Sequence, residues 1–377
     1  MGRFWGFSGT AQHGVGDKRK LLALDGGGIR GLISIEVLAR LEDELRPEDG
    51  AQFVLADAFD YVAGTSTGAI LAACISLGMR VDKIRSFYLE SGPAMFSKAK
   101  LRELANSRFG ASTLIELLKD VMGDTTLGSD KLRTLLMMVM RNASTDSPWP
   151  VSNNPRAHYN DRKRIEEGKD CNLDLPLWQL VRASTAAPTY FPPELIQAGG
   201  GKPFVMVDGG VTTYNNPAFL LFLMATVEPY RLCWPTGVDK LMLVSIGTGR
   251  SPRANADLRA REMNLLYNAG SIPSALMFAA LNEQDMLCRV FGECRHGAEL
   301  DREIGTLIGA KGPVDPKLFA YARYNAELTP EWLENEGLGD IDCKNVQRLD
   351  STAHMDQLAR VGRRVADQVA AEHFRGF

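Results

Sequence analysis

A serine framed by two glycines, set between a short apolar run and a longer helix-like stretch, constrains this chain more than any other feature. The pentapeptide is Gly64-Thr65-Ser66-Thr67-Gly68, with apolar residues at 59–63 before it and at 69–77 after it. Glycine permits a sharp backbone turn, so a strand, a tight turn and a helix would expose the Ser66 hydroxyl. The pattern predicts a serine nucleophile, although so short a motif also arises by chance in a chain with 36 glycines.

Apolar runs of strand length alternate with stretches of helical periodicity along the chain. This alternation indicates an α/β fold in which helices cover both faces of a largely parallel central sheet, a three-layer αβα arrangement. The irregular segment 142–168 is expected to be a long surface loop. We expect strands at 20–24, 59–63, 135–140, 204–207, 240–246 and 319–328, and helices at 29–45, 69–77, 83–90, 114–121, 178–187 and 352–371.

A second glycine motif, Asp25-Gly26-Gly27-Gly28-Ile29-Arg30-Gly31, lies between the first strand and the first helix. It fits the dinucleotide-binding pattern G-x-G-x-x-G. Such a site also needs an acidic residue at the end of the second strand, whereas Asp43 and Glu44 fall in the expected helix. Glycine N–H groups at a helix N-terminus can instead stabilise an oxyanion. Since neighbouring parallel strands end at one edge, we favour an oxyanion role for Gly26, Gly27 and Gly28 beside Ser66.

A third motif, Val207-Asp208-Gly209-Gly210-Val211, follows another expected strand. A carboxylate there can accept the serine proton directly, or orient a histidine that does so. Of the downstream histidines, His296 lies in a loop-like stretch, and His354 and His373 flank the C-terminal helix as expected surface or helix-end residues. The order of motifs therefore predicts a Ser66–Asp208 dyad rather than a triad.

Composition limits the partners and the compartment. The 43 basic and 46 acidic side chains of the 377-residue chain leave a net charge of −3, which gives no reason to expect a nucleic-acid polymer. The six cysteines have no C-x-x-C spacing, so we expect no metal site and reduced thiols. The absence of a signal-peptide core and of a long apolar run predicts a cytoplasmic protein that meets any lipid from the water side.

In this order, the three motifs resemble those of the patatin-like acyl hydrolases, and the stretches 183–192 and 245–249 resemble that family as well. The resemblance covers at least residues 20–249. It implies a parallel α/β core, phospholipase A-type hydrolysis of lipid acyl esters at the inner face of a membrane, and no cofactor or metal. Asp208-Gly209-Gly210 differs slightly from the Asp-Gly-Ala of many members, which leaves room for the same turn.

Carried over by position, the resemblance implies a role for each motif residue. Ser66 is the nucleophile, Asp208 is the general base, Gly26, Gly27 and Gly28 supply oxyanion donors, and Arg30 is a supporting cation. The remaining motif glycines are Gly31, Gly64, Gly68, Gly209 and Gly210. Two alternatives stay open: an acyltransferase with the same acyl-serine chemistry, and a non-catalytic nucleotide-binding protein that uses the Gly26–Gly31 loop.

The resemblance also suggests an organisation and a regulator. We expect an N-terminal extension at 1–19, a catalytic core at 20–250, and a mostly helical C-terminal region at 251–377 packed on the core in the same domain. Length and tail resemble relatives that are antiphage effectors switched on by a cyclic dinucleotide. Arg323 with Tyr321 and Tyr324 is one candidate pocket for that ligand, although a plain strand explains these residues better.

Two segments are candidates for contact with lipid. Residues 271–291 form an apolar stretch that is either an amphipathic lid or, as we prefer, a core helix that ends the α/β domain. Trp149, between two prolines, is a possible interfacial aromatic side chain, since such rings favour the headgroup zone of a bilayer.

Overall fold

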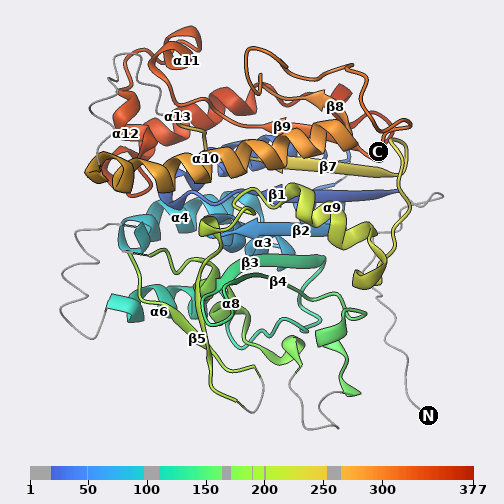
Figure 1. The fold of residues 1–377 in the computed structure, drawn as a ribbon, viewed down its shortest axis with the longest axis vertical. Helices are drawn as coiled ribbons and strands as arrows, with labels where there is room; N and C mark the ends of the chain where they lie inside the picture. The colour runs from blue at the N-terminus through green and yellow to red at the C-terminus, as the bar shows by residue number, and fades with distance from the viewer. Residues whose placement is uncertain are drawn as a thin grey trace.

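A mixed β-sheet runs through the middle of the molecule, with helices on both of its faces (Figure 1). The structure is a computed structural model, and it describes residues 18–48, 50–96, 110–163, 171–188, 190–198, 201–252 and 265–377. The strands follow the order β5-β6-β3-β2-β1-β7-β9-β8, and β4 pairs with β3. Their bounds are β1 (Arg19–Leu24), β2 (Tyr61–Thr65), β3 (Leu135–Asn142), β4 (Ser147–Ser152), β5 (Glu194–Ile196), β6 (Phe204–Asp208), β7 (Leu241–Ile246), β8 (Glu293–His296) and β9 (Ala320–Tyr324).

Two separate apolar cores lie on the two faces of the sheet. In β1, Leu22 and Leu24 belong to one core and Leu21 and Ala23 to the other, because side chains alternate along a strand. The first core also holds side chains of α1 (Gly31–Glu44), α3 (Thr67–Ser76), α4 (Val81–Phe96), α6 (Gly110–Met122), α8 (Leu177–Ser184) and α13 (Met355–Ala366). The second holds side chains of α9 (Ala218–Thr226) and α10 (Leu265–Phe291), which cross in front of the sheet in Figure 1. The prediction of a three-layer αβα fold is confirmed.

The C-terminal region adds strands to the sheet as well as helices to its faces. β9 pairs in parallel with β7, and β8 pairs in parallel with β9. α13 packs on α1 so closely that a Cβ atom on Gly362 would lie 2.9 Å from the Cα of Ile33. The expected division at residue 250 stays a prediction, and residues 1–17 of the expected extension lie outside the described part of the chain.

The strand β3 brings two other strands together end to end. Met138 pairs with Gly64 of β2 and with Val151 of β4, so β2 and β4 lie on opposite edges of β3. Met140 pairs with Trp149 of β4 and with Asp208 of β6, so β6 lies on the same edge as β2. β6 is antiparallel to β3, unlike β2. The C-terminal ends of β2 and β6 therefore meet from opposite directions.

The expectation of a surface loop at 142–168 is wrong in part, because β4 forms a hairpin with β3 there. Pro148 and Pro150 are two residues apart, so their missing N–H groups belong to one edge of the strand, and an edge strand tolerates that loss. Trp149 is half-buried against Phe204, with 6.4 Å between ring centroids. The sheet therefore accounts for Trp149 without a lipid contact.

A buried ion pair connects the start of the first glycine loop to the last part of the sheet. Arg323 of β9 donates to both carboxylate oxygens of Asp25, at 2.8 and 2.5 Å, and to the Ser245 hydroxyl at 2.6 Å. Asp25 is 0% exposed and Arg323 is 2% exposed. Burial alone would lower the pKa of Arg323, but the Asp25 carboxylate outweighs it and raises that pKa.

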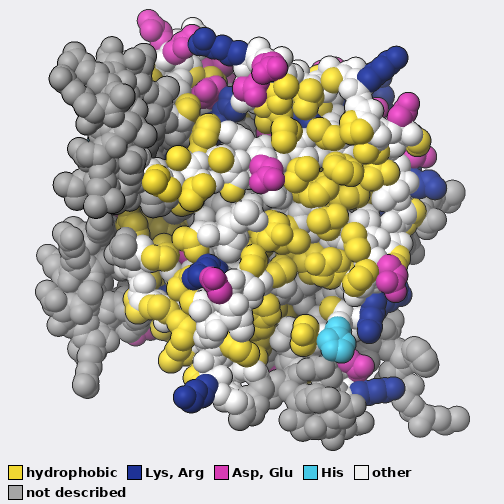
Figure 2. Space-filling model, viewed as in Figure 1, with side chains coloured by type: hydrophobic (Ala, Val, Ile, Leu, Met, Phe, Trp, Pro, Cys, Tyr) yellow, Lys and Arg dark blue, Asp and Glu magenta, His cyan; other side chains and the backbone are white. Residues whose placement is uncertain are grey.

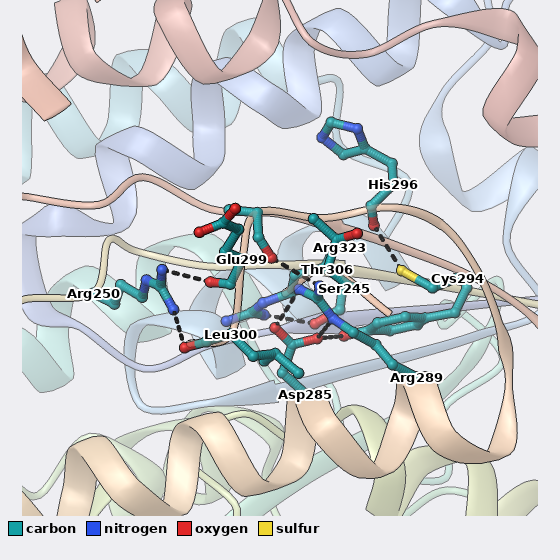
Figure 3. Close-up of polar contacts among 12 residues, drawn as sticks. Ser245, Arg250, Asp285, Arg289, Cys294, His296, Glu299, Leu300, Thr306 and Arg323 are labelled. Atoms are coloured by element: carbon teal, nitrogen blue, oxygen red, sulfur yellow. Dashed lines mark hydrogen bonds and ion pairs between the residues drawn. The ribbon is translucent and has the colours of Figure 1, made fainter. Parts of the chain in front are cut away.

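A second ion pair lies beside the first. Arg289 and Asp285 rise from α10 toward the strands (Figure 3), and two bonds of 2.8 Å join them. The Tyr321 hydroxyl donates to Asp285 at 3.0 Å, and the Tyr324 hydroxyl is 2.8 Å from Nδ1 of His373.

These contacts bear on two expectations. The preferred reading of Tyr321, Arg323 and Tyr324 as part of a plain strand is confirmed by β9. Arg323, Tyr321 and Tyr324 are all buried within the protein, so they do not form a pocket for a cyclic dinucleotide. His373, expected to be a surface or helix-end residue, is buried and lies after the end of α13, in the short 3-10 helix Ala371–Phe374. The helix expected at 352–371 is α13 (Met355–Ala366), which is shorter and packs its apolar stripe on the body of the protein.

We expect Arg323→Met to lower the free energy of unfolding by about 3–5 kcal/mol, because it leaves the Asp25 carboxylate buried without its partner. Arg360→Met is the matched control, since Arg360 pairs with Asp340 at the surface, where solvent screening makes an ion pair contribute little to stability. Urea unfolding of both variants and the parent measures the difference. Equal losses in the two variants would contradict the role given to the buried pair.

Candidate active site

Ser66 occupies a strained turn between β2 and α3. Its φ of 55° and ψ of −122° lie outside the regions that residues with side chains prefer, at a cost of about 1–3 kcal/mol. The framing glycines are needed for close packing: a Cβ atom on Gly68 would strike the Leu24 carbonyl of β1, and one on Gly64 would strike the Gly68 carbonyl. The turn therefore sits directly against the neighbouring strand.

The end-to-end meeting of β2 and β6 places Asp208 opposite Ser66. The Ser66 hydroxyl donates a hydrogen bond of 2.6 Å to Oδ2 of Asp208. The other carboxylate oxygen, Oδ1, accepts a 2.6 Å bond from the Gly210 amide. The Asp208 amide donates to the Ala186 carbonyl at 3.0 Å. Both the side chain and the backbone of Asp208 are thus held.

Burial dominates the electrostatics of this carboxyl group. Asp208 is 4% exposed, and burial raises its pKa to about 6 from 3.8. The hydrogen bonds from Ser66 and Gly210 and the charge of Arg182 oppose the rise but do not cancel it. A carboxylate with a raised pKa is a stronger base, which suits it to accept a proton near neutral pH.

The glycine loop offers two of its three expected N–H donors. The Gly26 amide donates to the Asn215 carbonyl at 3.0 Å, so the prediction that Gly26 supplies an oxyanion donor is wrong. The amides of Gly27 and Gly28 have no acceptor within the described residues. Gly28 has a φ of +59° and its Cα faces the Leu349 carbonyl, which leaves no space for a side chain.

Arg30 lines the same cavity as the glycine loop. Its Nη1 donates to the Ser251 hydroxyl at 3.2 Å and to the Gln347 carbonyl at 3.3 Å. Burial lowers the pKa of Arg30 to about 10, against the opposing effect of Asp25. The group therefore stays charged at neutral pH and provides positive potential beside the loop.

A cavity of about 250 Å³ opens over Ser66 and Asp208. None of the histidines in the described ranges lines it. Its wall is mostly apolar, which suits a hydrocarbon chain better than a charged ligand. The apolar lining comprises Phe96, Ala187, Pro188, Phe191, Val211, Met277 and Leu349, and the polar lining beyond the motifs comprises Thr185, Tyr190 and Asn215.

The remaining motif glycines lie around this cavity. Gly31 begins α1, where a Cβ atom would come within 2.7 Å of the Thr67 hydroxyl. Gly209 packs against the Val139 carbonyl of β3, and Gly210 lines the cavity. Close packing thus accounts for both glycines of the third motif. Within the described residues, no group of histidine, cysteine and acidic side chains is arranged to hold a metal ion.

Several contacts at the site come from residues to which the sequence assigned no role. Ser184 accepts a hydrogen bond from the Ser66 amide, and Thr248 donates to the Gly26 carbonyl. Both lie in the stretches 183–192 and 245–249, which carried a family resemblance but no chemical signal. Leu349 comes from the C-terminal region, about 280 residues after Ser66, so no local pattern places it at the cavity.

Comparison with known proteins identifies the family. The family model described as patatin-like phospholipase matches residues 22–222, which is more than half of the chain. The chain belongs to the patatin-like phospholipase family. This patatin-like phospholipase is therefore a lipid acyl hydrolase, a serine carboxylic-ester hydrolase, and the alternative of a non-catalytic nucleotide-binding protein is not retained.

Named relatives agree with this assignment. Patatin-like protein 2 of Oryza sativa subsp. indica is 27% identical, with 92% of each chain covered. Patatin-like protein 1 of Arabidopsis thaliana is 27% identical and covers 76% of this chain and 77% of its own. Patatin-17 of Solanum cardiophyllum is 29% identical over 66% of this chain and 65% of its own. Among solved structures, VipD from Legionella pneumophila is 12% identical, with a TM-score of 0.37 over 92% of this chain and 67% of its own.

Proposed function

We propose that this patatin-like phospholipase hydrolyses lipid acyl esters with Ser66 as nucleophile and Asp208 as general base. The observation that carries the proposal is the 2.6 Å hydrogen bond from the Ser66 hydroxyl to the Asp208 carboxylate, at the floor of a mostly apolar cavity. A serine hydroxyl is a weak nucleophile until a base takes its proton, and Asp208 is the one acidic group that lines this cavity in the described residues.

The proposed reaction has two halves. Asp208 takes the hydroxyl proton as Ser66 Oγ attacks the acyl carbonyl, which becomes a tetrahedral oxyanion beside the amides of Gly27 and Gly28. Collapse of that intermediate breaks the ester bond, and Asp208 returns its proton to the departing alcohol. A water molecule then attacks the acyl-serine, again with Asp208 as base, and releases the fatty acid and the free Ser66 hydroxyl. Arg30 adds positive potential at the oxyanion.

We expect Ser66→Ala and Asp208→Asn to lower kcat by at least about 10³-fold, because loss of the nucleophile or the base removes the acyl-serine route. Ser34→Ala is the matched control, since Ser34 is a fully buried serine whose hydroxyl bonds the Gly247 carbonyl away from the cavity. Release of fatty acid from phospholipid vesicles measures the rates. Near-parental turnover in purified, folded Ser66→Ala would refute the proposal.

The raised pKa of Asp208 predicts the pH dependence. Below a pH of about 6 the carboxyl group holds its own proton and cannot accept that of Ser66. We therefore expect kcat/KM to fall as the pH drops through about 6, and to level off above it. A pH–rate profile with a short-chain ester substrate tests this. An acid limb near 4, where an ordinary aspartate titrates, would contradict the assignment of Asp208 as the base.

We propose in addition that α10 makes peripheral contact with a lipid surface, at the cytoplasmic face of the membrane. No helix in the described part of the chain combines the length and the apolar character needed to cross a bilayer. Figure 2 shows apolar side chains gathered over α9 and α10. Along α10, Ile272 is 50% exposed and Leu276 is 65% exposed, and the next residue, Met277, lines the cavity. One helix thus connects the exposed apolar surface to the site.

Residues 271–291 of α10 have features of both alternatives, an interfacial helix and a core helix. Gln284, Asp285, Cys288 and Arg289 in its C-terminal half are buried, as a core helix requires. Its N-terminal half exposes apolar side chains, as an interfacial helix requires.

We expect Leu276→Asp to weaken flotation with anionic and zwitterionic phospholipid vesicles, because a carboxylate in place of an exposed apolar side chain opposes entry into the acyl boundary. Ile308→Asp is the control, since Ile308 is likewise an exposed apolar residue, at 50%, but lies outside α10. Flotation of both variants should be measured beside the parent. Unchanged flotation of Leu276→Asp would remove α10 from the proposed contact.

Acyl transfer and activation by a cyclic dinucleotide stay predictions. Transfer uses the same acyl-serine and differs only in the acceptor, so product analysis separates a free fatty acid from a new ester. The residues first considered for the dinucleotide are buried, and the resemblance to antiphage effectors alone supports that ligand. Mass spectrometry of products from mixed phospholipids, with and without cyclic dinucleotides, tests both: equal rates would rule out gating by the ligands added.

A further inference from the structure

The chain at the C-terminal end of α8 contacts both halves of the site through Ser184 and Ala186, which do not line the substrate cavity. The Ser184 hydroxyl accepts a 3.0 Å hydrogen bond from the Ser66 amide and donates a 2.6 Å bond to the Val139 carbonyl of β3. Two residues later, the Ala186 carbonyl accepts a 3.0 Å bond from the Asp208 amide. A single turn of chain therefore holds the backbone of Ser66 and that of Asp208.

Val139 marks the junction at which the site is assembled. It pairs with Thr65, the last residue of β2, while the next residue, Met140, pairs with Asp208, the last residue of β6. Ser184 thus ties the Ser66 turn to the position on β3 where the two strands meet. The hydroxyl acts as a bridge from the nucleophile to the strand that also positions the base.

The Ser66 backbone needs such support. A positive φ at a residue with a side chain persists only where the surrounding structure enforces it. Within the described residues, the Ser66 amide donates its hydrogen bond to the Ser184 hydroxyl. Ser184 is 0% exposed and does not line the cavity, although its neighbour Thr185 does. Ser184 therefore does not touch a substrate in the cavity, and its direct contact with the reacting residues is the hydrogen bond from the Ser66 amide.

We propose that Ser184 is a positioning residue for acyl-serine formation, whose hydroxyl holds the Ser66 turn so that Oγ faces the Asp208 carboxylate. The inference rests on the proposed Ser66–Asp208 chemistry. It differs from a purely structural role, in which the buried hydroxyl would only satisfy the Val139 carbonyl. A structural role affects stability alone, whereas a positioning role affects kcat at constant KM.

The test compares two fully buried serines. Ser184→Ala removes the bridge, and Ser76→Ala removes a buried hydroxyl on α3 that bonds the Thr134 hydroxyl away from the cavity. We expect Ser184→Ala to lower kcat by about 10–100-fold with KM within two-fold of the parent, because small misplacements of a reacting group cost up to about 10²-fold. Ser76→Ala should leave kcat within two-fold, even where its thermal unfolding shifts equally.

Two further measurements keep the proposal open to refutation if Ser184→Ala folds poorly. Ser184→Cys keeps a side chain of similar shape with a weaker hydrogen-bonding group, so it should fold and show an intermediate kcat. The rate of fluorophosphonate labelling reports the reactivity of Ser66 without lipid binding, and it should fall in the same order as kcat.

The outcomes separate this inference from the proposed function. Parental kcat and labelling in folded Ser184→Ala or Ser184→Cys would overturn the positioning role while Ser66→Ala stays inactive. An equal loss of kcat in Ser76→Ala would show general destabilisation and would also overturn it. Full activity of Ser66→Ala would instead refute the proposed function itself.

Discussion

The buried ion pair between Asp25 and Arg323 is the contact on which the arrangement of the site depends. It joins the residue that begins the glycine loop to β9, close to 300 positions later in the chain. Two buried charges are tolerated only when they are paired with good geometry. A shift of either segment would leave a buried charge without its partner, which is costly. A second buried pair, Asp285 and Arg289 of α10, lies beside the first and is joined to β9 through the Tyr321 hydroxyl.

The Ser66–Asp208 pair results from the sheet topology more than from either motif. β3 accepts β2 as a parallel neighbour and β6 as an antiparallel one on the same edge, so the two strand ends meet. Ser184, the last residue of α8, and Ala186, two residues after it, then hold the two ends by hydrogen bonds. The Ser66 hydroxyl and the Asp208 carboxylate lie 2.6 Å apart because three elements fix the two backbones. Both side chains are short, so the backbone positions determine this distance. Little rotational freedom is left to lose on reaching the reactive geometry.

Local sequence patterns predicted a helix or strand well where the residues of that element alone determine its conformation. Apolar runs predicted β1, β3 and β7, and 3.6-residue periodicity predicted α1 and α13. The hairpin strand β4 was missed because its prolines and polar neighbours are typical of loops, and only pairing with β3 makes it a strand. The Gly26 donor was predicted wrongly because its acceptor, the Asn215 carbonyl, is remote in sequence. Ser184 carried no signal because a single serine at a helix end has many uses.

By itself, the sequence determined the α/β class, the turn that presents Ser66, and the residue types that the chemistry requires. These follow from short-range physics: side-chain periodicity, and the sharp backbone turn that glycine permits on either side of Ser66. The tertiary structure alone decided which way β6 runs, which glycine amides stay free, and which helix holds the Ser66 turn. Those outcomes depend on hydrogen bonds and buried charges between segments far apart in the chain, whose partners no local pattern specifies.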